Sequence, residues 1–411
     1  MKVNGIIAEY NPFHNGHKFH LEDAKDRNHA DYTIVVMSGN FVQRGAPALL
    51  DKYSRARMAL LNGADLVLEL PCLYATSSAE FFATGAVSLF DKLGVIDHLC
   101  FGSECGDISI LERIARILLE EPESYAKLLR SYLKQGLSYP VARTNALIQY
   151  DPSLSGYKDV LSSPNNILGI EYLKALIRRN SRIQPDTTLR IGSSYHDKRL
   201  GKNHCSALAI RHAIFSEHNK DFLREQMPDT AYDILKSALD TSVLFQANDL
   251  SAALHYKLLS EKETGYSGYL DVSQELSDRI RNSLYNFTDY DSFCDLLKSK
   301  DMTYTRISRC LLHILLGMTN NDMALGKELD YVPYARVLGF RKDSSALLTA
   351  IKEKASIPLI TKLADAGNIL DEKAFSFLQN EIRMNDIYLS MTATKTGNPA
   401  TNEYSTPIVI L

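Results

Sequence analysis

Residues 5–17 read GIIAEYNPFHNGH, and this stretch decides the fold. A short apolar run that enters an Asn-Pro-Phe turn and then His-x-Gly-His predicts a strand, a tight turn and the start of a helix. Gly16 has no Cβ and would let a nucleotide approach the backbone closely. The helix N-terminus adds unpaired N–H donors and the positive end of a dipole. The stretch therefore predicts a cradle for the triphosphate of ATP.

Two histidines of this stretch, His14 and His17, are predicted to be catalytic. Because they are three residues apart at a helix start, their side chains share one face, about one turn apart. Imidazole donors in that position stabilise the negative charge that develops at the α-phosphate during nucleophilic attack. The alternative is that a short motif occurs here by chance and that both histidines are ordinary surface residues.

Strand and helix patterns alternate over the first 110 residues and predict an α/β domain. The predicted strands are Val3–Ala8, Thr33–Met37, Ala64–Leu70 and Val95–Phe101, and the predicted helices between them are His17–Asp26, Asp51–Leu61 and Ser77–Leu93. Strands separated by helices imply βαβ units around a parallel sheet, as in Rossmann-like folds. Ligands of such sheets bind beyond the carboxyl ends of the strands, where the loops Ser38–Gly45 and Phe101–Glu104 are expected.

The pattern changes near residue 225. A helix at Asn165–Arg179, a strand at Leu189–Ser193 and a helix from Ser206 are the last predicted elements of the α/β part. Further on, the predicted elements are helices, at Ala231–Leu239, Leu250–Leu259, Gln274–Asn282 and Arg306–Leu316. We therefore expect residues 1–225 to form the Rossmann-like domain with a parallel sheet, and residues 226–411 to form a mainly α-helical domain.

Composition excludes several classes of protein. The 411 residues include 46 Lys and Arg against 49 Asp and Glu, so the net charge of −3 rules out an overall basic coat. Any site for nucleic acid must then be a local patch. No apolar run approaches the roughly 18 residues of a membrane span, and six scattered cysteines without a Cys-x-x-Cys pair argue against a zinc site. The sequence predicts a cytoplasmic protein with no membrane segment and no metal site of its own.

A basic segment runs from Arg190 to Arg211, with five Lys or Arg and one acidic residue. A phosphate-rich ligand would favour such a stretch, in which Ser206 opens the next predicted helix. The alternatives are a solvated charged loop and a serine that only caps the helix. The neighbouring His196 and Asp197 are expected to be structural or to orient a substrate, because adjacent side chains point in different directions.

Taken together, these segments resemble the tRNA(Met) cytidine acetate ligase family of the HxGH nucleotidyltransferase superfamily. The resemblance covers essentially the whole chain, is strongest over residues 1–212, and is carried by residues 5–17, Ser38–Gly45, Phe101–Glu104, Pro164–Gly169 and Tyr195–Asp197. In the superfamily, a later turn of the form Ile-Ser-x-Thr-x-x-Arg holds the β- and γ-phosphates. Ser206 and Arg211 match that turn, whereas Cys205 and Leu208 depart from it.

The resemblance implies a nucleotidyltransferase-like ATP-binding domain at the N-terminus and an ATP-dependent ligase activity. The enzyme would convert the wobble cytidine of elongator tRNA(Met) to N4-acetylcytidine with acetate and ATP, through acetyl-adenylate, and would release pyrophosphate and AMP. Mg²⁺ is expected to accompany ATP. Acetate is ionised at neutral pH, so its attack on the α-phosphate needs no general base.

The resemblance also implies which residues bind ATP. Asn165 is chosen over Asn166 because it stands nearer the predicted helix start. The expected ATP-binding residues are Ile7, Ala8, Glu9, Tyr10, Asn11, Pro12, Phe13, His14, Asn15, Gly16, His17, Lys18, Phe19, His20, Gly102, Asn165, Arg190, Ile191 and Ser206.

The tRNA is expected on a basic patch to which both domains contribute. The expected tRNA-binding residues are Lys198, Arg199, Lys202, Arg341 and Lys342. Two other functions remain open at this stage. One is a small-molecule adenylyltransferase, whose members are commonly shorter than this chain. The other is a non-enzymatic RNA-binding protein with a nucleotidyltransferase fold, against which the intact His14 and His17 argue.

Overall fold

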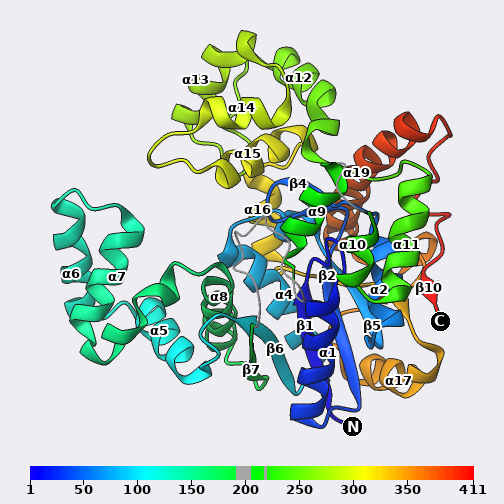
Figure 1. Cartoon of the computed structure of the whole chain (residues 1–411), viewed down its shortest axis with the longest axis horizontal. Coiled ribbons are helices and arrows are strands. Elements are labelled where there is room, and N and C mark those ends of the chain that lie inside the picture. Colours follow the sequence, from blue (N-terminus) through cyan, green and yellow to red (C-terminus); the bar gives the residue numbers. More distant parts are fainter. Residues whose placement is uncertain (191–204, 217–219) are drawn as a thin grey trace.

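A mostly parallel β-sheet forms the centre of the molecule (Figure 1). The computed structural model describes residues 1–190, 205–216 and 220–411. In this part of the chain the strand order is β10-β8-β5-β2-β1-β6-β7, with β9 paired to β8 and with β3 and β4 in a separate hairpin. The strands are β1 Val3–Ala8, β2 Tyr32–Ser38, β3 Phe41–Val42, β4 Ala46–Pro47, β5 Leu66–Leu70, β6 His98–Ser103, β7 Gln184–Leu189, β8 Ala335–Phe340, β9 Leu359–Ile360 and β10 Val409–Ile410. Neighbours in the large sheet are parallel except for β5 and β8, which confirms the predicted α/β fold with a parallel sheet.

Helices connect the strands and build most of the C-terminal part. The first of them are α1 Asn15–Asn28, α2 Lys52–Leu61, α3 Cys72–Ala75, α4 Ala79–Leu93, α5 Ile108–Glu120, α6 Glu123–Lys134, α7 Tyr139–Tyr150, α8 Pro164–Arg178, α9 Ala207–Phe215 and α10 Lys220–Glu225. The later ones are α11 Asp229–Asp240, α12 Ser251–Ser260, α13 Gln274–Ser283, α14 Tyr290–Leu297, α15 Tyr304–Leu316, α16 Asn320–Glu328, α17 Ser345–Lys354, α18 Ala366–Ile369 and α19 Glu372–Thr396. Short 3-10 helices are η1 Pro152–Leu161, η2 Ala247–Leu250, η3 Leu284–Asn286, η4 Lys342–Ser344 and η5 Leu363–Asp365. None of the helices described is long and apolar enough to cross a membrane.

The sheet has an apolar core on each face. Along β2, Ile34 and Val36 belong to one core together with residues of α4 and α8, whereas Val35 and Met37 belong to the other with residues of α1 and α2. All four side chains are fully buried. Successive side chains of a strand point to opposite faces, so a strand that is covered on both faces needs apolar residues throughout. This explains the unbroken apolar run that predicted the strand.

The C-terminal part is mainly helical, as predicted, but it also extends the sheet. Strand β8 pairs antiparallel with β5, and β10 pairs with β8. Sequence analysis missed β8 because its conformation depends on a partner strand from the first quarter of the chain, and no local pattern records that pairing. Both halves of the chain therefore contribute to one sheet, and a domain boundary near residue 225 stays a prediction.

One strand was predicted at the wrong place. Strand β7 occupies Gln184–Leu189 rather than Leu189–Ser193, of which residues 191–193 lie outside the described residues. Among the strands described, β7 pairs with β6 alone, at the edge of the sheet. An edge strand accommodates Pro185, which cannot donate a backbone hydrogen bond. A strand can therefore form where Pro185 and Asp186 are typical of a turn.

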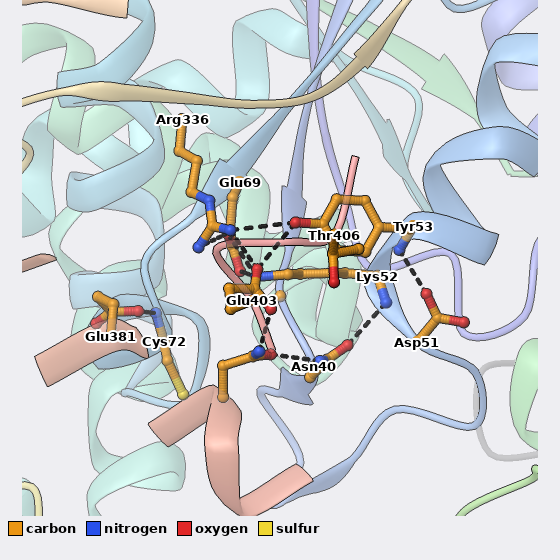
Figure 2. A network of polar contacts seen from close by, with 12 residues as sticks. Asn40, Asp51, Lys52, Tyr53, Glu69, Cys72, Arg336, Glu381, Glu403 and Thr406 are labelled. Atoms are coloured by element: carbon orange, nitrogen blue, oxygen red, sulfur yellow. Dashed lines mark hydrogen bonds and ion pairs between the residues drawn. The ribbon is translucent and has the colours of Figure 1, made fainter. Parts of the chain in front are cut away.

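A buried cluster of four charged side chains joins the C-terminal end of the chain to the sheet (Figure 2). Lys52 Nζ lies 2.8 Å from Glu69 Oε1 and 2.7 Å from Glu403 Oε1. Arg336 forms ion pairs with the same two carboxylates. Lys52 begins α2, Glu69 lies in β5 and Arg336 lies in β8. Two cations and two anions thus balance in the interior and hold the segment around Glu403 against three elements of the α/β core.

Candidate active site

A cavity opens at the carboxyl ends of β1 and β6, where α/β sheets bind their ligands. The predicted ATP-binding residues that line it are Ile7, Ala8, Glu9, Tyr10, Asn11, His14, His17, His20, Gly102, Asn165, Arg190 and Ser206. Those outside the lining are Pro12, Phe13, Asn15, Gly16, Lys18 and Phe19. Ile191 lies outside the described residues. The fold therefore gathers segments that are far apart in the sequence around one cavity.

His14 and His17 cap the N-terminus of α1 with their side chains. His14 Nδ1 accepts a hydrogen bond from the backbone N–H of Gly16 at 3.0 Å, and His17 Nδ1 accepts one from the backbone N–H of His14 at 3.2 Å. The two rings stack with their centroids 3.7 Å apart. In a neutral imidazole whose Nδ1 is an acceptor, Nε2 carries the proton. This geometry therefore places the proton of both imidazoles on Nε2, and N–H donors are what a site that stabilises developing negative charge requires.

Burial favours the neutral form of two imidazoles of this site, those of His17 and His20. Burial, together with the charges of His14, Arg190 and His20, holds the pKa of His17 well below its usual value of 6.5. Burial and then the charge of Arg190 lower the pKa of His20 to about 4. Three arginines of the lining, Arg44, Arg190 and Arg211, supply fixed positive charge to the cavity.

The motif residues outside the lining build its turn. Phe13 is fully buried in the apolar core. Asn15 is tied to the segment before α11, because its side chain donates to the carbonyl of Glu225 at 2.8 Å and its backbone N–H donates to the carbonyl of Gln226 at 3.0 Å. A Cβ at Gly16 would lie only 2.9 Å from Cε1 of the His14 ring. Gly16 thus makes room for that ring, a role that sequence analysis did not anticipate.

Three helix N-termini contribute to the lining, those of α1, α8 and α9. Asn165 lies at the second position of α8, and Ser206 is the N-cap of α9. Ser206 Oγ accepts a hydrogen bond from the backbone N–H of Ala209 at 3.2 Å. This serine is therefore a helix cap and a lining residue at once, so the two interpretations of its sequence context are compatible. A helix N-terminus carries a partial positive charge, which suits a polyanion. At α8, however, the Glu104 carboxylate already accepts from the backbone N–H groups of Asn165 and Asn166.

Hydrogen bonds in both directions fix the loop after β6 to the start of α8. Glu104 Oε1 accepts from Asn165 Nδ2 at 2.6 Å, and Glu104 Oε2 accepts from the backbone N–H of Asn166 at 2.9 Å. Asn166 Oδ1 in turn accepts from the backbone N–H of Glu104 at 2.9 Å. Asn166 is buried outside the lining, whereas Asn165 is part of it, and the choice of Asn165 as the ATP-binding asparagine stays a prediction. A Cβ at Gly102 would lie 3.2 Å from Arg190 Cγ, so this glycine makes room for the arginine.

Sequence analysis placed the loop Ser38–Gly45 at this edge of the sheet but did not single out its lining residues, Gln43 and Arg44. They lie at the tip of the β3–β4 hairpin. The carbonyl of Gly45, at the same tip, accepts hydrogen bonds from Tyr290 Oη and Ser308 Oγ, both at 2.9 Å. Tyr290 and Ser308 belong to α14 and α15. The helical C-terminal part therefore supports a wall of the cavity.

An apolar part of the lining was also missed. Its residues are Phe82, Phe101, Leu168, Tyr172, Ala207 and Leu208. Leu168 and Tyr172 follow Asn165 by three and seven residues, so one face of α8 carries all three. That spacing is the signal in the sequence that would have identified them.

Two polar atoms of the lining have no hydrogen-bond partner within the part of the chain that the structure describes. These atoms are the Tyr10 hydroxyl oxygen and His20 Nε2, and both are buried. A buried polar group without a partner is destabilising, and both residues belong to the lining of the cavity. In residues 1–190, 205–216 and 220–411, no group of three or more His, Cys, Asp and Glu is arranged to hold a metal ion.

The residues predicted to bind tRNA are not brought to the cavity by the described part of the fold. Lys198, Arg199 and Lys202 lie outside the described residues. Arg341 and Lys342 follow β8, and the backbone N–H of Arg341 donates to the carbonyl of Asp65, just before β5, at 3.0 Å. Arg341 and Lys342 therefore lie at the amino ends of the parallel strands, whereas the cavity lies at their carboxyl ends. A role of Arg341 and Lys342 in tRNA binding stays a prediction, and it would concern RNA away from the modified base.

Comparisons with known proteins find relatives that match along the whole chain. A family model described as HIGH Nucleotidyl Transferase matches residues 1–403. The tRNA(Met) cytidine acetate ligase of Clostridium kluyveri is 43% identical over 403 residues, which cover 95% of this chain and 98% of that protein. The tRNA(Met) cytidine acetate ligase of Acetivibrio thermocellus is 40% identical over 418 residues, covering 100% of both chains. Two crystal structures of Thermotoga maritima TmcAL, 31% identical and matching over 100% of both chains, have TM-scores of 0.91 for the apo form I and 0.88 for form II bound with alpha-thio ATP.

Proposed function

The chain belongs to the tRNA(Met) cytidine acetate ligase family of HIGH nucleotidyl transferases, and we propose from this that it uses ATP to join acetate to the wobble cytidine of elongator tRNA(Met). The observation that carries the proposal is the cavity at the start of α1, where His14 and His17 stack and each has an Nε2–H donor. The T. maritima relative binds alpha-thio ATP. The same kind of ligand suits the N-termini of α1 and α9 and three arginines around one cavity.

In the first step, acetate would attack the α-phosphate of ATP and give acetyl-adenylate. One phosphorus–oxygen bond forms, another breaks, and pyrophosphate leaves. Because acetate is already an anion, no proton has to be removed, and the protein must only bring two anions together and stabilise the added charge. His14 and His17 would donate from Nε2 to the α-phosphate, while the arginines of the lining would neutralise the triphosphate.

Mg²⁺ would arrive with ATP rather than occupy a site of the protein. Among the described lining residues, Glu9 is the only carboxylate, which does not make a metal cage. Mg²⁺ keeps several waters and binds substrate phosphates, so it would add to the neutralisation of the triphosphate.

We expect AMP and pyrophosphate, rather than ADP and phosphate, as the products when ATP is consumed. The reason is that the donors at the α1 N-terminus favour attack at the α-phosphate, and the sequence has no GxxxxGK[ST] loop that would hold the γ-phosphate for transfer. Chromatography of labelled nucleotides, with and without acetate, measures this, together with acetate-dependent exchange of pyrophosphate into ATP. ADP as the main product would contradict the proposal.

In the second step, the N4 amine of cytidine would attack the acetyl carbon. The nitrogen–carbon bond forms, the bond between the acetyl carbon and the adenylate oxygen breaks, AMP leaves, and the amine loses a proton. Glu9 is suited to accept this proton. Its Oε1 accepts a hydrogen bond from the backbone N–H of Gln43 at 2.8 Å, which orients the carboxylate. Burial and the charge of Glu9 raise the pKa of Tyr172. The carboxylate of Glu9 therefore lies near the apolar side of the cavity, where the cytosine ring would pack.

Glu9→Gln is expected to slow acetyl transfer to tRNA more than it slows acetate-dependent pyrophosphate exchange. The amide can still accept the hydrogen bond from Gln43, but it cannot take up a proton. General-base catalysis contributes about 10²–10⁴ in rate, so the ratio of exchange to transfer should rise by about 10² or more. Single-turnover transfer and exchange without RNA give the two rates. Equal losses in both would mean that Glu9 acts in ATP binding and would contradict the proton-acceptor role.

A further inference from the structure

The segment between β6 and α8 leaves the cavity and returns to it. Gly102 near the end of β6 and Asn165 at the start of α8 both line the cavity, and the chain between them forms α5, α6, α7 and η1. Figure 1 shows these helices projecting from one side of the molecule, with α6 and α7 farthest from the sheet. The α6–α7 hairpin, residues 123–150, is therefore rooted at the rim of the site and extends away from it.

The hairpin is basic although the chain as a whole is not. Residues 123–150 contain Lys127, Arg130, Lys134 and Arg143 against one acidic residue, Glu123, whereas the whole chain has a net charge of −3. Lys127, Arg130 and Lys134 are spaced by three and four residues, so they share one face of α6. All three are exposed. Lys127 Nζ pairs with Glu123 Oε1 at 2.8 Å, so Arg130 and Lys134 supply the net positive charge of this face.

The tip of the hairpin adds exposed apolar side chains to this charge. Leu133, Tyr139 and Val141 are 39%, 54% and 48% exposed. The Arg143 guanidinium lies over the Tyr139 ring, 5.8 Å from its centroid. Clustered exposed apolar residues mark interaction surfaces. Aromatic rings beside arginines stack on unpaired bases of single-stranded RNA.

We propose that the α6–α7 hairpin binds the tRNA whose cytidine enters the cavity, with the α6 face on its phosphates and Tyr139 on an unpaired base. The proposal rests on the proposed function. An RNA that places one base in the cavity continues beyond the rim, and the hairpin is rooted there. Another protein is the competing partner, but protein interfaces are depleted in lysine, and the net positive charge of one helix face fits a polyanion.

The test compares two variants that reverse the same number of charges. Arg130→Glu with Lys134→Glu changes the hairpin, and Lys352→Glu with Lys354→Glu changes two exposed lysines of α17, which are not among the predicted tRNA-binding residues. The hairpin variant should bind tRNA on the order of tenfold more weakly, with a salt dependence lower by about one to two units of slope. Its acetate-dependent pyrophosphate exchange without RNA should equal that of the wild type. The proposal requires the hairpin variant to lose more affinity than the comparator.

A third variant, Tyr139→Ala, separates stacking from charge. It should weaken tRNA binding by about tenfold and leave the salt slope unchanged. Unchanged tRNA affinity in both hairpin variants would overturn the proposal and indicate that the tip serves another protein. A loss in the comparator as large as that in the charge-reversed hairpin would also overturn it. If the wild type itself fails to exchange pyrophosphate with acetate, the proposed function fails instead, because exchange requires no RNA.

Discussion

Alanine in place of His14 or His17 is expected to lower the rate of acetate-dependent pyrophosphate exchange by about 10²–10³. Each substitution removes one preorganised Nε2–H donor, and the loss of a single donor to developing charge typically has an effect of this size. The rate is measured on purified protein at saturating ATP and acetate, without RNA. Circular dichroism and urea unfolding establish that the variants are folded.

The capping role of both side chains decides how this experiment must be controlled. His14 accepts from the backbone N–H of Gly16, and His17 accepts from the backbone N–H of His14, so each alanine also removes a cap. Losing an N-cap destabilises a helix by about 1 kcal/mol. His14→Asn and His17→Gln keep an acceptor at the N-cap and N3 positions, where asparagine and glutamine are favoured. If the histidines only capped α1, these two variants would exchange pyrophosphate at nearly the wild-type rate.

Local patterns predicted the N-terminal half of the fold well, for a physical reason. A strand covered on both faces must be apolar throughout, so β2 was visible in the sequence. The C-terminal strands were not visible, because Ala335–Phe340 becomes a strand by pairing with Leu66–Leu70, a partner that lies far away in the chain. The edge strand Gln184–Leu189 was displaced in the prediction because its proline and aspartate are tolerated only by virtue of its place in the sheet.

The candidate site divides in the same way. Residues of the GIIAEYNPFHNGH stretch could be predicted because strand, turn and helix start follow one another in the sequence. Gln43 and Arg44 could not be singled out, because the hairpin that carries them is held by Tyr290 and Ser308. The role of Gly16 could not be predicted either, because it depends on how the ring of His14 folds back over its own helix. Contacts between distant segments decide these features.

Glu403→Gln is expected to destabilise the protein by about 3–5 kcal/mol at pH 7, because it removes one partner from a buried set of ion pairs. Glu403 is 2% exposed, contacts Lys52 and Arg336, and accepts a hydrogen bond from Tyr53 Oη at 2.9 Å. Without its charge, two buried cations would face Glu69 alone. The free energy of unfolding in urea at pH 7 measures the effect.

A surface ion pair of this protein supplies the matched control. Glu328→Gln removes the partner of Lys373, and the side chains of that pair are 57% and 60% exposed. Exposed pairs contribute little to stability, because water already solvates both charges. The two substitutions make the same chemical change, so a difference between their effects reports burial. Equal effects would mean that the cluster around Glu403 does not hold the C-terminal segment to the sheet.

The pH dependence gives an independent test of the same charge. Burial alone would raise the pKa of Glu403, but the charges of Lys52 and Arg336 lower it from 4.5 to about 2. A carboxyl group whose pKa is lowered by folding contributes stability above the pKa of the unfolded chain and loses that contribution as the pH falls toward its folded value. The difference in unfolding free energy between the wild type and Glu403→Gln should therefore be full at pH 7 and shrink between about pH 4.5 and pH 2. If the difference were the same at pH 7 and pH 3, the lost packing or hydrogen bonds of Glu403, rather than its charge, would account for the destabilisation.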